Sequence, residues 1–146
     1  MLPELLSKIE ARVQALVQDA TPPPAPTETG TIGWLEILDM LKAVWPEGAM
    51  QNRLHMDDMQ YPICTIADLR RFIDWDKTDL LGYSTELLDC DDFATALAGS
   101  FARYKQWSGF PVGRVNGNLY NGHAFTIAVA WPSLEDRTPR LYYIEP

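Results

Sequence analysis

The chain has 146 residues, 47% of them apolar and 22% charged, and its twenty acidic and twelve basic residues give a net charge of -8. This length supports one domain with a core, and the composition excludes wholesale disorder. The negative charge repels phosphate backbones and anionic lipid, and no apolar run reaches the roughly 20 residues that span a bilayer. We therefore expect neither nucleic acid nor membrane as a partner.

The start of the chain carries one apolar seam with alternating spacings of four and three. This spacing predicts an amphipathic helix over residues 1–20. The seam could fold back onto the main domain, or residues 2–20 could mediate self-association or docking into a larger assembly, and both interpretations stay open. The seam consists of Leu2, Leu6, Ile9, Val13, Leu16 and Ala20.

The N-terminus lacks the pattern of a secretory signal, so we expect a cytoplasmic protein.

Residues 21–30 contain four prolines, which forbid helix and favour an extended, semi-rigid linker. The main domain is then expected over residues 31–146. Its first element is a predicted core helix between Gly33 and Trp45, while residues 46–64 show no clear period. The apolar positions of that helix are Trp34, Leu35, Leu38, Leu41, Val44 and Trp45.

A second helix is predicted to begin after a capping arrangement of Thr65 with Asp68 and to end near Trp75. The acidic run at 74–79 lacks the glycine and the final glutamate of a calcium loop, so we interpret it as a solvated turn and expect no metal.

The last 60 residues predict a helix followed by a sheet. Residues 90 to about 106 repeat apolar side chains four apart, which places Cys90 in the first turn of a helix. Strands are expected over 112–115 and 123–131, and residues 141–145 should return antiparallel to the latter. A helical first part and a meander in the second predict an α+β domain.

Cys90 is the strongest candidate for chemistry, because free amide hydrogens at a helix start favour a thiolate. The neighbouring carboxylates oppose this, so a cationic partner is required. Of the two histidines in the chain, His123 opens a strand, whereas His55 lies in an acidic loop without supporting pattern. Glu145, on the returning strand, would orient the imidazole. Cys64 is expected to be a packed thiol, and two cysteines without metal spacing fit a reducing compartment.

Each of these residues, taken singly, has an ordinary structural explanation, and only their joint order favours catalysis. That order resembles the signature of the transglutaminase-like (papain-like) cysteine enzymes, over about residues 85–146. The motifs are Cys90-Asp-Asp-Phe-Ala94, Gly113-Arg-Val-Asn-Gly117, Gly122-His-Ala-Phe125 and Tyr143-Ile-Glu-Pro146.

The resemblance implies a papain/transglutaminase-like core, with N-terminal helices and the Cys90 helix packed on a small antiparallel sheet. It also implies Cys90 as nucleophile, His123 as base and acid, Glu145 as the orienting acid, and Asp92 as structural support. The chain departs from the family in having Glu where Asp is usual, and in stopping where members normally continue.

We therefore expect thiol-dependent acyl transfer, with hydrolysis of a peptide or amide bond favoured over cross-linking, and no cofactor. The alternative is a binding or structural module without turnover, anchored through its N-terminal helix. Compact phage-encoded proteins combine a docking helix with such a domain, so a phage-particle component is one form of this alternative.

Overall fold

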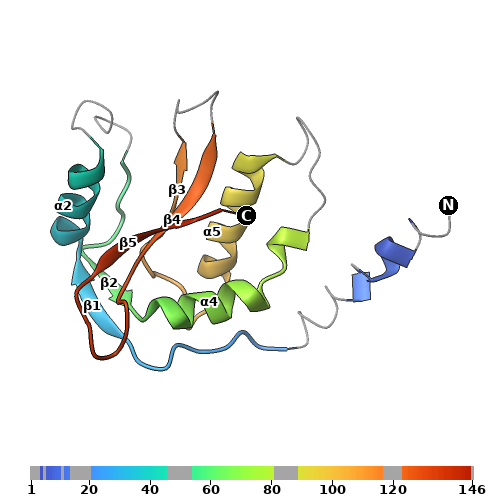
Figure 1. Ribbon diagram of the computed structural model, residues 1–146, viewed down its shortest axis with the longest axis horizontal. Coiled ribbons are helices and arrows are strands. Elements are labelled where there is room, and N and C mark those ends of the chain that lie inside the picture. Colours follow the sequence, from blue (N-terminus) through green and yellow to red (C-terminus); the bar gives the residue numbers. More distant parts are fainter. Residues whose placement is uncertain are drawn as a thin grey trace.

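The computed structural model describes residues 4, 6–10, 12–13, 21–45, 54–80, 89–116 and 123–145, which fold into an α+β arrangement (Figure 1). No helix in these ranges is both long enough and apolar enough to cross a bilayer. In chain order the elements are β1 (Gly30–Gly33), α2 (Trp34–Val44), β2 (Gln60–Ile63), α4 (Ile66–Trp75), a 3-10 turn (Thr78–Leu80), α5 (Cys90–Arg103), β3 (Val112–Asn116), β4 (Ala124–Ala130) and β5 (Arg140–Ile144).

The central sheet has the antiparallel order β3-β4-β5, as the predicted meander requires. Its register pairs Phe125 with Val115 and Thr126 with Ile144. Small side chains of β4 face α5, where the hydroxyl of Thr126 donates to the carbonyl of Ala94 at 3.3 Å. Because side chains alternate along a strand, Phe125 and Ile127 face the other side.

This sheet separates two hydrophobic cores, one on each face. The first core packs α4, α5 and the 104–110 turn against one face, and it is rich in aromatic rings: Phe72 lies 4.1 Å from Phe101 and 4.9 Å from Trp107, measured between ring centroids. The second core packs β1, α2 and β2 against the other face. Its buried members are Ile32, Ile37, Leu41, Ile63, Val129 and Trp131.

Helix α2 forms where it was predicted, but its core face differs from the predicted one. The buried residues are Ile37 and Leu41, whereas Leu35 and Val44 are exposed. The helix lies at the surface, so one stripe of its side chains reaches the second core, against which Met40 and Trp45 also pack.

The segment that showed no period contains strand β2, which pairs antiparallel with β1. Pro62 lies within β2 and the strand is only four residues long, so its sequence carried little strand signal. Gly30 in β1 is required by a close approach: a Cβ there would lie 2.5 Å from the ring of Trp131.

Helix α4 begins with the predicted cap. The hydroxyl of Thr65 accepts a hydrogen bond from the amide of Asp68 at 3.1 Å and donates to Asp68 Oδ2 at 2.9 Å. The helix ends at Trp75, as predicted. The following turn is not simply solvated, because Asp76 is buried and accepts hydrogen bonds from Ser100 of α5 and from the amide of Thr78.

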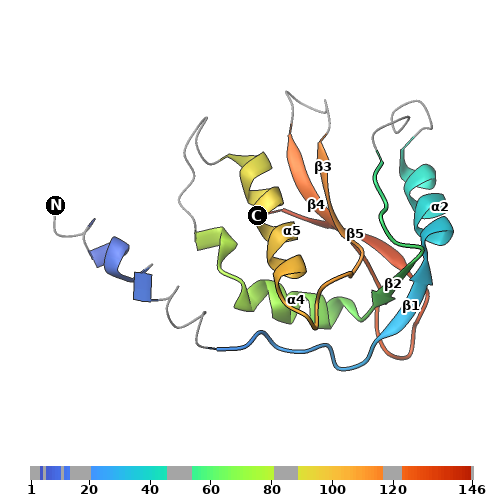
Figure 2. The same cartoon turned by 180° about the vertical axis from the view of Figure 1, so that it is seen from behind.

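Residues 21–29, here called the strap, are extended as predicted but do not stand off from the body as a spacer. Trp107 Nε1 donates to the carbonyl of Pro24 at 2.9 Å, and Thr27 donates to buried Asp68 from its amide at 3.1 Å and its hydroxyl at 2.8 Å. Figures 1 and 2 show the strap running along the edge of the body beside α4. The prediction of a linker separate from the main domain is therefore corrected. The backbone carbonyls of this proline-rich segment are not paired within a helix, and they accept hydrogen bonds from donors on the body.

Helical residues precede the strap at 6–10 and 12–13, and the two ribbon views place them outside the body (Figures 1 and 2). Leu6, Ile9 and Val13 are about half exposed. Their seam partner, and with it the role of residues 1–20, stays a prediction, and the remaining seam positions lie outside the described residues.

Candidate active site

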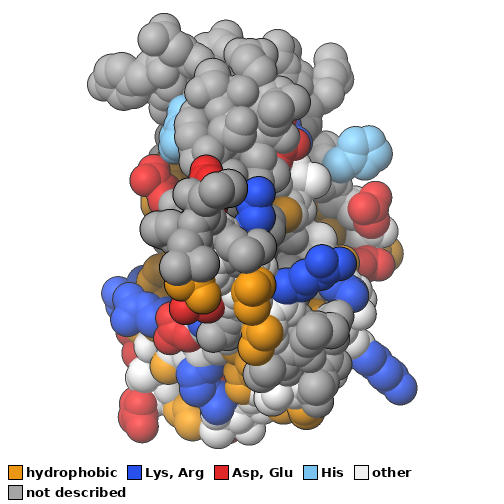
Figure 3. All heavy atoms as spheres, turned by 90° about the vertical axis from the view of Figure 1, so that its right-hand side faces the viewer, with side chains coloured by type: hydrophobic (Ala, Val, Ile, Leu, Met, Phe, Trp, Pro, Cys, Tyr) orange, Lys and Arg blue, Asp and Glu red, His pale blue; other side chains and the backbone are white. Residues whose placement is uncertain are grey.

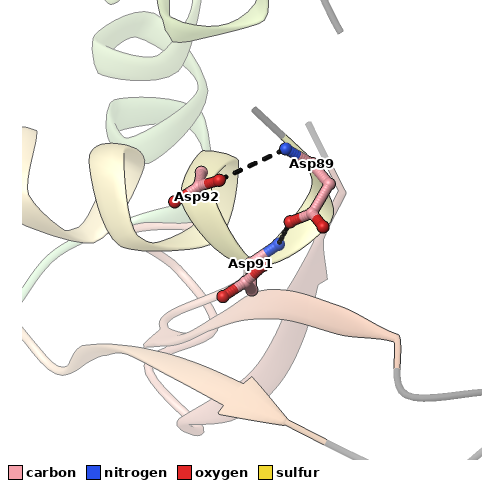
Figure 4. Close-up of side chains that lie close together, drawn as sticks. All are labelled: Asp89, Asp91 and Asp92. Carbon is pink, nitrogen blue, oxygen red and sulfur yellow. Dashed lines mark hydrogen bonds between the residues drawn. The ribbon is translucent and has the colours of Figure 1, made fainter. Parts of the chain in front are cut away.

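Helix α5 begins at Cys90, and acidic side chains accept hydrogen bonds from the backbone amides at its start. Asp89 is the N-cap and accepts a hydrogen bond from the amide of Asp91 at 3.3 Å, while Asp92 accepts one from the amide of Asp89 at 3.4 Å (Figure 4). These reciprocal bonds form a capping box. Asp92 therefore binds a backbone amide at the helix start, as predicted for a supporting residue.

The Cys90 sulfur lies between this helix start and the first residue of β4. It is partly buried and accepts a hydrogen bond from the amide of Ala124 at 3.4 Å. The amides at the helix start are already bonded within the capping box, so the Ala124 amide is a backbone donor that reaches the sulfur from a separate element.

His123 and Glu145 meet at the same end of the sheet. His123 Nε2 lies 3.4 Å from Glu145 Oε1, and the side chains are 44% and 71% exposed. The β4–β5 register brings them together, because continuing it sets Glu145 opposite Phe125, two residues from His123. Imidazole rings are visible at the surface in the space-filling view (Figure 3). Glu145 engages Nε2, so Nδ1 is the ring nitrogen that remains for a second partner.

The sulfur and the imidazole lie on different sides of β4. The His123 ring stacks beside Phe125 at 6.1 Å between centroids, on the face opposite α5. Ala124, next in sequence, faces α5 and Cys90. Between these two described side chains the structure has no hydrogen bond, and the direct contact of Cys90 with His123 stays a prediction.

An acidic cluster and an arginine complete the surroundings of Cys90. Carboxylate oxygens of Asp89, Asp91 and Asp92 lie within 4.8 Å of one another. The hydrogen bond between Asp89 and Asp91, together with the nearby carboxylate charges, raises the pKa of Asp91 above its ordinary value, and Arg114 opposes this rise. Arg114 NH2 lies 3.3 Å from Asp91 Oδ2. Sequence reasoning gave Arg114 no role, because only the β3–β4 register places it over α5.

The other two candidates lie apart from this site. Cys64 is fully buried, and its thiol contacts the carbonyl of Thr65 at 3.6 Å. Burial, followed by the charge of Asp68, raises the pKa of Cys64 to about 12. It is a packed thiol, as predicted. His55 is fully exposed and pairs with Asp57 at 3.7 Å.

The described residues can thus supply a partly exposed thiol at a helix start, backbone donors for negative charge, and an imidazole held by a carboxylate. These are parts that acyl transfer through sulfur uses. Comparison of the chain with known protein families, with curated proteins and with solved structures finds no match.

Proposed function

We propose that the protein is a thiol-dependent acyl-transfer enzyme that hydrolyses a peptide or amide bond, built on a transglutaminase-like core. The observation that carries the proposal is the convergence of Cys90, Ala124 and the His123–Glu145 pair at one end of the sheet. Three elements that are separate in sequence supply these groups, each at its first residue or just beyond its end.

The reaction proceeds through a thioester on Cys90. The thiolate attacks the substrate carbonyl carbon, the carbon–nitrogen bond breaks, and the imidazolium of His123 gives its proton to the departing amine. Water then attacks the thioester while the imidazole takes its proton, which releases the carboxylic acid and the thiolate. The carbonyl oxygen becomes negative in both steps and needs hydrogen-bond donors, of which the Cys90 amide is the first candidate.

Turnover requires the imidazole to leave its present orientation. Nδ1 is the nitrogen nearer the main chain, and the peptide that joins His123 to Ala124 already contacts the sulfur through its N–H. Rotation about the side-chain bonds of His123 would therefore carry Nδ1 around the end of β4 toward Cys90. Catalytic hydrogen bonds are often unformed in free enzymes and form only with substrate, so the resting geometry is compatible with this role.

The second candidate is a binding module without turnover. The observation that favours it is the present separation of sulfur and imidazole on opposite sides of β4, together with carboxylates on both sides of Cys90. In such a module His123 and Glu145 would form an ordinary surface ion pair. The N-terminal helix would then serve as its anchor.

The two candidates differ in the reactivity of Cys90. In the full chain, we expect iodoacetamide at pH 6.5 to alkylate Cys90 at least about 100-fold faster than Cys64, because Cys64 reacts only when the core opens. His123→Ala should slow the alkylation of Cys90 about tenfold or more at this pH. Mass spectrometry of the two cysteine peptides measures both rates. Slow labelling of Cys90 that His123→Ala leaves unchanged would favour the binding module.

Turnover itself is tested with an activated ester and a panel of peptide anilides. The enzyme should release a burst of p-nitrophenol from p-nitrophenyl acetate and carry one acetyl group on the Cys90 peptide, whereas Cys90→Ser should show neither at a comparable rate. Cys64→Ala is the matched control and should keep the burst. An acetyl group distributed over surface lysines, with no burst, would refute the acyl-enzyme.

A further inference from the structure

The guanidinium group of Arg114, on β3, contacts the first two turns of α5 and a neighbouring residue of its own strand. Its Nε donates to Asn116 Oδ1 at 2.8 Å, NH1 donates to the hydroxyl of Thr95 at 2.6 Å, and NH2 lies 3.3 Å from Asp91 Oδ2. A planar fork with several donors can make these bonds together, whereas an ammonium group cannot. The side chain is only one-third exposed, although it is charged. Arg114 is therefore fixed in place beside the residue that follows Cys90.

Among the described residues, carboxylates outnumber cationic side chains around the start of α5. The start of α5 contributes the carboxylates described above, and β5 contributes Glu145. His123, which precedes β4, lies against Glu145, and β3 contributes the cation Arg114. A thiolate beside several carboxylates is disfavoured unless a cation lies close by. Arg114 is the cation that the structure places against these carboxylates, through its contact with Asp91.

We propose that Arg114 is a positioning residue that keeps Cys90 reactive near neutral pH, by offsetting the carboxylates at the start of α5 and by holding β3 against that turn. This inference rests on the proposed role of Cys90 as nucleophile. The effect is moderate, because the Arg114–Asp91 pair is partly exposed and is screened by salt.

The test compares Arg114→Gln with Arg114→Lys in the full chain, by measuring the iodoacetamide rate at Cys90 from pH 5.5 to 10. We expect Arg114→Gln to move the midpoint of the pH–rate profile upward by about half a unit, which slows alkylation about threefold on the acidic side. Arg114→Lys retains the charge and should move it less than half as far. Added salt should shrink the difference between wild type and Arg114→Gln.

Arg140→Gln is the matched control, because Arg140 forms a similar surface pair with Asp136, at 2.8 Å, at the opposite end of β4 and β5. Its profile should superimpose on that of the wild type. A profile for Arg114→Gln that also superimposes, or one for Arg114→Lys displaced as far as that for Arg114→Gln, would overturn the proposal. A merely structural role would change stability without a salt-dependent shift.

Two further readouts keep the result interpretable. Cys64 reports opening of the fold, so a variant that misfolds reveals itself by fast labelling there. If Arg114→Gln fails this check, Asp91→Asn should move the Cys90 midpoint in the opposite direction, downward, and no shift would overturn the inference. A wild-type Cys90 that titrates as an ordinary thiol would refute the proposed function, whereas a reactive wild-type Cys90 with unshifted Arg114 variants would refute the role of Arg114 alone.

Discussion

The two cysteines lie in surroundings built from the same parts. Each cysteine precedes or begins a helix. Each of these helices is capped by a side chain that bonds an acidic residue or an amide of the first turn. In each case an arginine contacts a carboxylate of the first turn. In the first set the cysteine, the cap and the carboxylate are buried, whereas the carboxylate of the second set is 47% exposed. The first set, called the buried set after these residues, is Cys64, Thr65, Asp68 and the exposed Arg71 at α4, and the surface set is Cys90, Asp89, Asp91 and Arg114 at α5.

The difference between the sets lies in burial and in the number of hydrogen bonds to the carboxylate. Asp68 is 1% exposed and accepts from Thr27, Thr65 and Arg71. Burial alone would raise its pKa, but these hydrogen bonds outweigh burial and hold the pKa of Asp68 below its ordinary value. Asp91 makes its ion pair in contact with water. The same chemical parts are therefore buried around Asp68 and partly exposed around Asp91.

The largest expected effect on stability comes from removing the buried carboxylate. Asp68→Ala removes the carboxylate that accepts from Arg71 and from the hydroxyls of Thr27 and Thr65, so we expect a loss of about 3 kcal/mol in the free energy of unfolding. Urea denaturation followed by tryptophan fluorescence measures it. Asp91→Ala is the counterpart at the surface and should leave the urea midpoint nearly unchanged. Equal losses in the two variants would break the comparison.

The same carboxylate gives a dependence on acid. Because the folded pKa of Asp68 is lowered, its stabilisation is present above about pH 4 and is lost as the pH falls through the folded pKa. The difference in unfolding free energy between the wild type and Asp68→Ala should therefore narrow below pH 4. A constant difference down to pH 2 would show that the carboxylate charge contributes nothing.

A smaller effect is expected at alkaline pH from Cys64. Its pKa is raised to about 12 in the folded state, so the unfolded chain loses the thiol proton first and stability falls as the pH rises above about 9. By pH 10.5 this contribution reaches about 2 kcal/mol. Cys64→Ala should lose this part of the decrease in unfolding free energy above pH 9, whatever stability the substitution removes at pH 7. Cys90→Ala should keep the wild-type slope above pH 9, and identical slopes for all three proteins would refute the assignment.

The sequence predicted elements well where a period or a cap was strong. The helix start at Thr65, the helix that begins at Cys90 and the antiparallel β4–β5 pair follow from capping residues and from regular apolar spacing. Strand β2 was missed because a four-residue strand that contains Pro62 has no period to detect. The strap was predicted to be a spacer because its composition indicates an extended segment. Composition does not indicate that donors such as Trp107 bind its carbonyls.

The position of the candidate residues at one end of the sheet was predictable, but their geometry there was not. The order of motifs brought Cys90, His123 and Glu145 to one end of the sheet, and the His123–Glu145 contact follows from the hairpin. The side of the strand on which His123 lies depends on register and on where alternation begins, and these are tertiary properties. The contacts of Arg114 could not be predicted for the same reason, since its partners Thr95 and Asp91 belong to another element.

The smallest expected effect concerns the two helix caps and separates the regions most finely. Thr65→Ala removes the cap of α4 and should cost about 1 kcal/mol, whereas Thr65→Ser keeps the hydroxyl and most of the stability. At α5, Asp89→Asn keeps a capping oxygen but removes a charge next to Cys90, so the unfolding midpoint should stay nearly constant while alkylation of Cys90 at pH 6.5 rises about twofold. Substituting the cap is thus expected to change the stability of the fold next to Cys64 and the alkylation rate next to Cys90. If Asp89→Asn instead changed stability and left the alkylation rate unchanged, the carboxylates at α5 would be structural caps alone, and the surface thiol would differ from the buried one only in its accessibility.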